Sequence, residues 1–122
     1  MNLSIYHYKA IIRSVYDGDT CKADIDLGLK SWVHGQKLRL ARIDTPEIRG
    51  ESHDEGIKVR DFVRSKILDQ EVFIQTVKDR TGKYGRYLAE IWVIENDGSI
   101  INLNDLLLDM NFAIRYGETA IS

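Results

Sequence analysis

Apolar and polar residues alternate along the first 30 positions of the chain in the manner of β-strands. The segment IYHYKAIIRSVY is rich in β-branched and aromatic residues, and the segment TCKADIDLGL alternates apolar with polar side chains. Between them, Asp17 and Gly18 form a residue pair that suits a tight hairpin turn. The pattern therefore predicts a strand, a turn and a second strand.

Further strands are expected downstream. A third strand covers about 36–44, and the segments EVFIQTVK and RYLAEIWVI flank the turn DRTGKYG, whose glycines suit a hairpin loop. The pair Asp97 and Gly98 predicts one more turn before a short apolar run at 99–101. Because hairpin turns join most of these strands, we expect them to pair antiparallel.

Two helices are expected, at about 55–69 and 103–111. Ser52 and Glu55 have the spacing of a capping box before the first helix, and Asn102 can cap the second. Each helix carries an apolar stripe that predicts packing in the core. The stripe residues are Val59, Phe62, Val63 and Ile67 in the first helix, and Leu103, Leu106, Leu107 and Met110 in the second.

Five strands, with one helix after the third and another at the end, predict an α+β fold. We expect the strands to close as a five-stranded antiparallel barrel of the oligonucleotide-binding (OB-fold) type. The chain has 122 residues, of which 43% are hydrophobic, and it shows no internal repeat or linker. That size predicts a single domain that covers 1–122.

Charge and cysteine content narrow the possible functions. Lys and Arg number 17 against 19 for Asp and Glu, a net charge of −2, so any binding to a polyanion requires a local basic patch. Cys21 is the single cysteine, which excludes an intrachain disulfide, and its apolar strand face predicts a buried thiol. We see no leader and no membrane-spanning run, which predicts a cytoplasmic protein, with secretion of a mature form as the alternative. We also expect a monomer.

Two aspartates are candidate metal ligands. Asp19 lies on the predicted inward face with Cys21, so its carboxylate needs a cation, a metal or water as partner. Asp44 ends its strand immediately before Thr45 and Pro46, where the chain has to leave the sheet. Carboxylates, a backbone carbonyl and waters are what calcium binds, so Asp19, Asp44 and Thr45 can hold such an ion. The alternative is that both aspartates are ordinary turn residues.

Two arginines and a glutamate add possible catalytic groups. Arg39 and Arg86 lie on or at the start of predicted strands, and the planar guanidinium suits phosphate oxygens. The alternative for each arginine is a surface ion pair. Glu47 follows Asp44 by three residues, which is close enough for it to act as a general base in the same site. Together these residues predict phosphodiester hydrolysis.

Three segments together resemble the staphylococcal nuclease-like (thermonuclease) domain family. They are VYDGDT at 15–20, LRLARIDTPE at 38–47 and KYGRYLAEIWV at 83–93, and the similarity extends over about 8–114. The resemblance implies one calcium ion, bound by the carboxylates of Asp19 and Asp44 and the backbone carbonyl of Thr45. It also implies that Arg39 and Arg86 bind phosphate. Glu47 falls on the family's proposed general base, or alternatively orders the loop and its waters.

The activity that the resemblance implies is calcium-dependent hydrolysis of DNA and RNA. The 5′-oxygen would leave, the products would end in 3′-phosphates, and single-stranded or unwound substrates would be favoured. Lys83 and Tyr84 resemble positions that contact a terminal phosphate, and Tyr116 is the candidate for contacts to the nucleotide. The loop after Glu47 is shorter than in the founding member of the family, which predicts a more open site.

Two further expectations concern nucleic-acid binding. A local positive groove is predicted from a basic set that consists of Arg39, Arg49, Lys78, Arg80, Lys83 and Arg86. The alternative function is a catalytically weak or inactive OB-fold module that binds single-stranded nucleic acid or a protein partner. Its candidate base-stacking residues are Tyr6, Tyr8, Trp32 and Tyr84.

Overall fold

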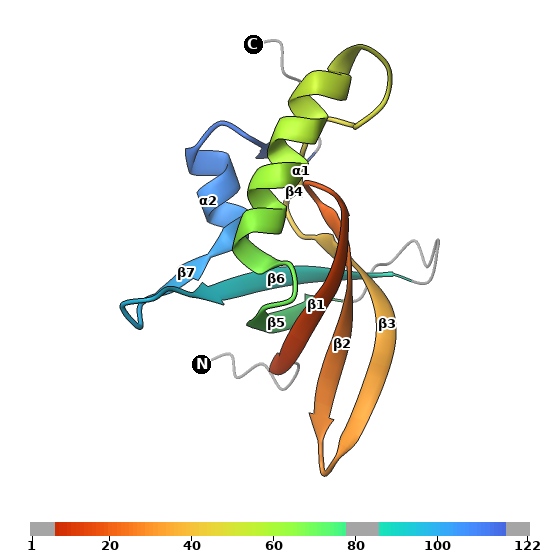
Figure 1. The fold of residues 1–122 in the computed structure, drawn as a ribbon, viewed down its shortest axis with the longest axis vertical. Helices are drawn as coiled ribbons and strands as arrows, with labels where there is room; N and C mark the ends of the chain where they lie inside the picture. The colour runs from red at the N-terminus through yellow and green to blue at the C-terminus, as the bar shows by residue number, and fades with distance from the viewer. Residues whose placement is uncertain (1–6, 78–85, 117–122) are drawn as a thin grey trace.

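The computed structural model describes residues 7–77 and 86–116, and five of its strands close a small barrel (Figure 1). The strands follow the order β3-β2-β1-β5-β6, and β3 also pairs with β6 to close the ring. The predicted α+β fold with a five-stranded barrel is therefore confirmed. The barrel strands are β1 (His7–Asp17), β2 (Thr20–Gly28), β3 (Ser31–Leu40), β5 (Glu71–Val77) and β6 (Tyr87–Ile94).

One pairing in the barrel differs from the antiparallel arrangement expected from the sequence. Strands β3 and β6 run parallel, with Leu38 opposite Tyr87 and Leu40 opposite Ala89. The other four pairings around the ring are antiparallel. A ring with an odd number of strands cannot alternate direction throughout, so one parallel pair is a geometric necessity of closing five strands.

The turns at both ends of β2 also differ from expectation. Asp17 pairs with Thr20, so the turn after β1 consists of Gly18 and Asp19, one residue later than the predicted pair. A register irregularity between Val15 and Asp17 in β1 accounts for the shift. At the other end, Leu29 and Lys30 turn the chain with φ of 54° and 65°, and β3 begins at Ser31 rather than near position 36.

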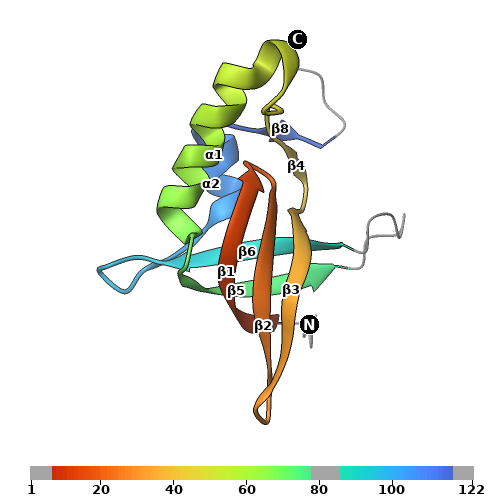
Figure 2. The ribbon, with the colours of Figure 1, turned by 45° about the vertical axis from the view of Figure 1, so that its right-hand side comes forward.

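Beyond Leu40 the chain leaves the barrel. Arg42 has a left-handed φ of 72°, and this kink separates β3 from the short strand β4 (Ile43–Asp44). Strand β4 then pairs antiparallel with β8 (Ile114–Arg115), which lies beside it above the barrel (Figure 2). The remaining strand, β7 (Ile100–Asn102), extends the sheet at β6.

The two predicted helices are present with shifted ends. Helix α1 (His53–Ile67) follows a 3₁₀ turn, η1 (Gly50–Ser52), and helix α2 (Leu103–Asp109) follows β7. The expected capping box is absent: Ser52 already belongs to η1, and its hydroxyl donates to the carbonyl of Glu47 at 2.8 Å. The predicted cap on α2 is confirmed, because Asn102 Oδ1 accepts from the Asp105 N–H at 2.8 Å.

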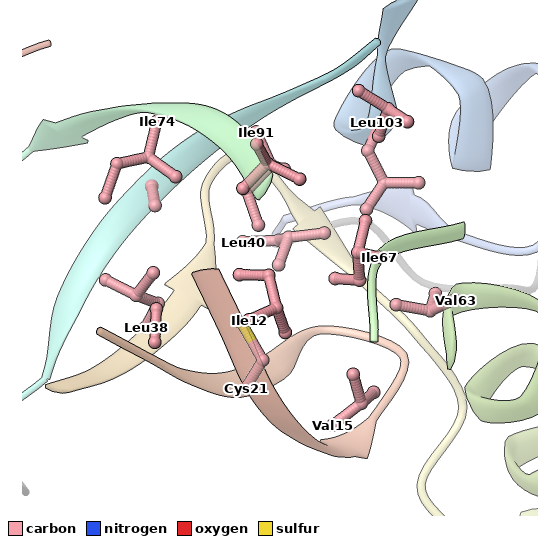
Figure 3. Close-up of a cluster of buried hydrophobic side chains, with 14 of the residues drawn as sticks. Ile12, Val15, Cys21, Leu38, Leu40, Val63, Ile67, Ile74, Ile91 and Leu103 are labelled. Carbon is pink, nitrogen blue, oxygen red and sulfur yellow. The ribbon is translucent and has the colours of Figure 1, made fainter. Parts of the chain in front are cut away.

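The core fills the barrel and continues beneath the helices (Figure 3). Ile12, Leu38, Leu40 and Ile91 come from the strands, and Ile67 of α1 packs against them. Helix α1 lies beside the end of β1 that leads into the Gly18 turn, while the β2–β3 hairpin projects away from both helices (Figures 1 and 2). The helices and strand β4 therefore surround one end of the barrel. Among the described helices none is long and apolar enough to cross a membrane.

Candidate active site

Arg39 and two aspartates meet at the end of the barrel beside α1. Nη2 of Arg39 lies 3.5 Å from Asp19 Oδ2 and also donates to Asp44 Oδ1 in a close ion pair. Asp19 and Arg39 are buried, with 7% and 8% of their surface exposed, whereas the Asp44 side chain is 38% exposed. One arginine thus pairs with two carboxylates that come from different segments of the chain.

The backbone around Arg42 explains how these groups come together. Arg39 is the next-to-last residue of β3, and Asp44 lies five residues later on β4. The left-handed kink at Arg42 directs β4 back toward Arg39. The Arg42 side chain holds the kink in place, because it binds both carboxylate oxygens of Glu90 at 2.7 Å and Asp105 at 2.8 Å.

The Arg39 guanidinium is held in a fixed orientation. Its Nη1 donates to the backbone carbonyls of Leu40 and Ile43, at 3.2 and 3.1 Å. Its Cζ lies 5.2 Å from the centre of the Tyr116 ring, a cation–π contact. Tyr116 reaches this position because its N–H donates to the carbonyl of Arg42 at 2.8 Å, beside the β4–β8 pairing. These contacts leave the Nη2 edge of Arg39 for carboxylate or phosphate oxygens.

The Gly18 turn adds a third carboxylate near Asp19. Asp17 Oδ1 accepts the backbone N–H of Asp19 at 3.1 Å. Burial, together with the negative charge of Asp19, raises the pKa of the Asp17 carboxyl to about 6. Negative charge is therefore concentrated at this end of the barrel beyond what Arg39 balances.

The oxygens around Asp19 suit a hard divalent cation. Asp19 Oδ2 accepts the Thr45 N–H at 3.1 Å, and Asp19 Oδ1 accepts the Thr20 hydroxyl at 3.0 Å. Thr45 Oγ1 is buried and has no hydrogen-bond partner among the residues described. Carboxylate, carbonyl and hydroxyl oxygens are the ligand types that calcium prefers, so the donor set fits that ion. Within 7–77 and 86–116, however, no three His, Cys, Asp or Glu side chains gather as a complete metal site.

Glycines allow the segments of the site to lie close together. A Cβ added to Gly18 would lie 2.6 Å from Val59 Cγ1 of α1 and 2.8 Å from Thr45 Oγ1. A Cβ added to Gly56 would lie 2.3 Å from the backbone oxygen of Glu47. Helix α1 therefore packs directly against both the Asp19 turn and the backbone of Glu47.

Of the other predicted site residues, Glu47 and Arg86 are described by the structure, and each lies on a segment next to this cluster. Glu47 is exposed on the loop that follows Asp44, where its backbone carbonyl accepts the Ser52 hydroxyl. Arg86 precedes β6 and lines a cleft that Thr20 of the site also lines. Lys83 and Tyr84 lie outside the described residues.

Two positioning residues are absent from the sequence prediction. One is Arg42, described above. The other is Asn104, which is fully buried within α2 and whose amide donates to the carbonyls of Ala41 and Ala89, each at 3.0 Å. An asparagine inside the largely apolar segment INLNDLLL is the one signal that could have revealed it, since a buried amide requires hydrogen-bond partners.

Comparison with known proteins agrees with the geometry. The family described as "Staphylococcal nuclease homologue" matches residues 37–120. An uncharacterized protein of Methanocaldococcus jannaschii, MJ1439, is 30% identical over 131 residues, which is 90% of this chain and 60% of that protein. A thermonuclease of Staphylococcus hyicus is 33% identical over 89 residues, which is 70% of this chain and 48% of that protein.

The chain thus spans about half to three fifths of the length of these relatives. The family match covers β4, both helices and the strand β6 that closes the barrel, and it includes Arg39, Asp44 and Glu47. The barrel, the helices and the family match agree with one another. The chain therefore belongs to the staphylococcal nuclease homologue family.

Proposed function

We propose that this protein hydrolyses phosphodiester bonds of DNA and RNA in a calcium-dependent reaction. The observation that carries the proposal is the Arg39 cluster, in which a nearly buried guanidinium fixed by two backbone carbonyls faces Asp19 and Asp44. The family match and the likeness to a thermonuclease support the same reaction class. A structural ion pair alone would not require an arginine that is anchored on one edge and directed toward an accessible carboxylate.

Each residue of the cluster has a defined task in this proposal. Calcium held by Asp19, Asp44 and the Thr45 carbonyl would neutralise charge on a phosphate oxygen. With Asp19 and Asp44 bound to calcium, the Nη2 edge of Arg39 would donate to the phosphoryl oxygens in place of Asp44, while the two backbone carbonyls keep the guanidinium in position. Arg86, in the adjoining cleft, adds a second guanidinium.

Glu47 accepts a proton from the attacking water. Its exposure on the loop leaves the carboxylate accessible to solvent, and Gly56 and Ser52 hold the backbone at that position. Water attacks phosphorus, the 5′-oxygen leaves, and the products end in 3′-phosphates. Tyr116, which is 69% exposed beside Arg39, is placed to contact the nucleotide, and Lys83 and Tyr84 are proposed to bind its terminal phosphate.

The experiment that tests the proposal measures cleavage of single-stranded DNA and of RNA with calcium, with magnesium and with chelator. We expect cleavage with calcium that chelator abolishes, and product ends that a phosphatase converts to 3′-hydroxyls. Glu47→Gln should reduce kcat by about 10²- to 10⁴-fold, the usual contribution of a general base. Arg39→Lys should reduce kcat by about 10²- to 10³-fold, as expected on loss of a preorganised donor.

Glu51→Gln is the matched control, because Glu51 is also exposed and lies four residues beyond Glu47. Equal rates for the two glutamine variants would remove Glu47 from the mechanism. Cleavage that persists in chelator would contradict calcium dependence. Tight binding of oligonucleotide without turnover under any condition would instead identify the protein as a non-catalytic nucleic-acid-binding module.

A further inference from the structure

The β2–β3 hairpin ends in an exposed leucine. Gly28 pairs with Ser31 across the turn. Leu29 and Lys30 therefore form the whole turn, with φ of 54° and 65°. Positive φ at both positions suits Asn-Gly and is unfavourable for leucine, because its Cβ crowds the following carbonyl oxygen. Leu29 is also 99% exposed, so packing inside this chain does not offset the cost. A strained and fully exposed apolar residue points to a contact with another molecule.

More apolar surface surrounds this tip. Among the described residues, half of the exposed large apolar and aromatic side chains lie on the hairpin or at the barrel end from which it projects. Apolar side chains that gather in this way, rather than singly, are typical of interaction surfaces. They are Leu27, Leu29, Trp32, Val33 and Tyr87.

A hollow of about 250 Å³ opens at the same end of the barrel, opposite to the helices. Side chains from all five barrel strands line it, and most of them are apolar or aromatic. An apolar cavity of roughly 150 Å³ can accept a molecule as large as benzene, so this hollow has room for a leucine side chain. The lining residues are Tyr8, Ile25, Leu27, Val33, Gln36, Thr76 and Tyr87.

The tip and the hollow lie at two levels of one hairpin. Ile25 lines the hollow, and Leu29 follows it by four residues, which is about 13 Å along a strand. A hairpin cannot place its own tip in a hollow at its base, but two hairpins that lie side by side and antiparallel bring each tip to the hollow of the other. We propose that this protein forms a symmetric dimer in which Leu29 of each copy occupies the barrel-end hollow of the other copy. Such a contact is self-complementary, as a two-fold interface requires.

The charges of the hairpin favour a second copy as the occupant. At neutral pH the segment 25–36 carries one negative residue, Asp26, and one positive residue, Lys30, so two copies do not repel each other. The antiparallel arrangement also brings Lys30 of each copy toward Asp26 of the other. A nucleic-acid strand, by contrast, requires an excess of cations, which this segment does not supply.

This inference departs from the monomer that the sequence led us to expect. It does not depend on the proposed function, because the hairpin projects from the end of the barrel opposite to the Arg39 cluster.

The test is sedimentation velocity over a range of protein concentrations. A contact of this small size should give a dissociation constant in the micromolar range, so the measurement covers about 1 µM to about 1 mM. Leu29→Asn should raise the dissociation constant about 100-fold, or about tenfold for each of the two leucines that leave a hollow. The same change should raise the melting temperature of the monomer, because asparagine tolerates the left-handed conformation.

Ile100→Asn is the matched control. Ile100 is also exposed and apolar, but it lies on β7, away from the hairpin, so its loss should leave the dissociation constant unchanged. Val33→Lys provides a second variant, since it places a charge in the lining of the hollow and leaves the tip intact.

A mixture of the two hairpin variants distinguishes insertion of Leu29 from general adhesion of apolar surfaces. Leu29→Asn keeps the hollow, and Val33→Lys keeps the tip, so a mixed dimer retains one of the two insertions. The mixture should therefore associate about tenfold more tightly than either variant alone. General adhesion gives no such recovery.

Loss of the dimer in Leu29→Asn with partial recovery in the mixture supports the inference. A monomer at every concentration, or equal association of Leu29→Asn and the unaltered protein, would overturn it. A monomer whose oligonucleotide binding falls in Trp32→Ala would overturn it as well and would assign this surface to nucleic acid. Cleavage by Leu29→Asn should match that of the unaltered protein, so failure of the dimer leaves the nuclease proposal in place, and the reverse also holds.

Discussion

Substitution of Asn104 by alanine should be among the most destabilising single changes in this protein. Asn104 is 0% exposed, and its side chain makes three hydrogen bonds to the backbone. Its Nδ2 donates to the carbonyls of Ala41 and Ala89, and its Oδ1 accepts the Ile91 N–H at 3.1 Å. The side chain thus joins α2 to β6 and to the segment that leads into the Arg42 kink.

The magnitude follows from the groups that lose a partner. Ala89 C=O retains its bond from the Ala41 N–H at 2.9 Å, but Ile91 N–H and Ala41 C=O lose the bond that Asn104 provides. A buried polar group without a partner costs about 1–3 kcal/mol, so two of them give a loss of about 2–6 kcal/mol. A domain is commonly stable by only about 5–15 kcal/mol, so the variant should lie close to its unfolding threshold.

Urea unfolding at equilibrium measures the change in free energy, and Asn102→Ala provides the comparison. Asn102 caps α2 from the end of β7 and is half-buried, so its loss should cost about 1 kcal/mol. If Asn104→Ala costs no more than Asn102→Ala, the reasoning from buried backbone partners is refuted. Asn104→Asp should be at least as damaging as alanine, because it places a carboxylate oxygen against two carbonyls.

Four further predictions concern other parts of the structure. Gly18→Ala should cost about 1–3 kcal/mol of stability by thermal unfolding, because the new Cβ would lie 2.6 Å from Val59; an unchanged melting temperature would contradict this. Cleavage should reach half its maximum at about 0.1–1 mM calcium, since two carboxylates make a weak site, and full activity at trace calcium would disprove it. Burial raises the pKa of the Cys21 thiol to about 12, so a thiol reagent should react slowly with the folded protein and quickly once urea unfolds it. The free energy of unfolding should fall as the pH rises above 9, because only the unfolded chain then loses the thiol proton. The hydrogen bond from Arg13 lowers the pKa of Asp24 to about 2, so the stability that this pair contributes is present above pH 4 and is lost as the pH falls toward 2. In the Asp24→Asn variant, the free energy of unfolding should therefore change less between pH 4 and pH 2.

The sequence predicts most of the barrel because strand periodicity and hairpin signals are local. It fails where the backbone departs from the usual residue preferences. Gly28 is the one turn signal at the end of β2, but Leu29, Lys30 and Arg42 adopt positive φ without being glycine or asparagine, so residue preferences do not reveal the turn at 29–30 or the kink after β3. The parallel pairing of β3 with β6 is likewise invisible to periodicity, because it arises only when the ring closes.

For the candidate site, the sequence predicts which residues take part, but it does not predict the contacts that fix their side chains in position. Burial of Asp19 against a cation is foreseen, but the anchoring of Arg39 by two carbonyls depends on the kink at Arg42. The predicted basic groove can be compared only in part, because Lys78, Arg80 and Lys83 lie outside the described residues. Of the described members of the expected set, Arg49 and Arg86 line the cleft beside Thr20 and Arg39 does not, while Lys22 and Lys37 enter it through cross-strand register.

The parallel pairing of β3 with β6 sets the order in which the site can assemble. Arg39 lies within that pairing, opposite Leu88, and Asp44 is held by β8, some 70 residues further along the chain. Contacts so distant in sequence form late, after the local hairpins. A chain still on the ribosome, with β4 made but β6 and β8 missing, contains Asp19, Arg39 and Asp44 without their arrangement, and its β3 keeps an open edge that can accept a foreign strand. Completion of the barrel therefore both assembles the site and removes that hazard.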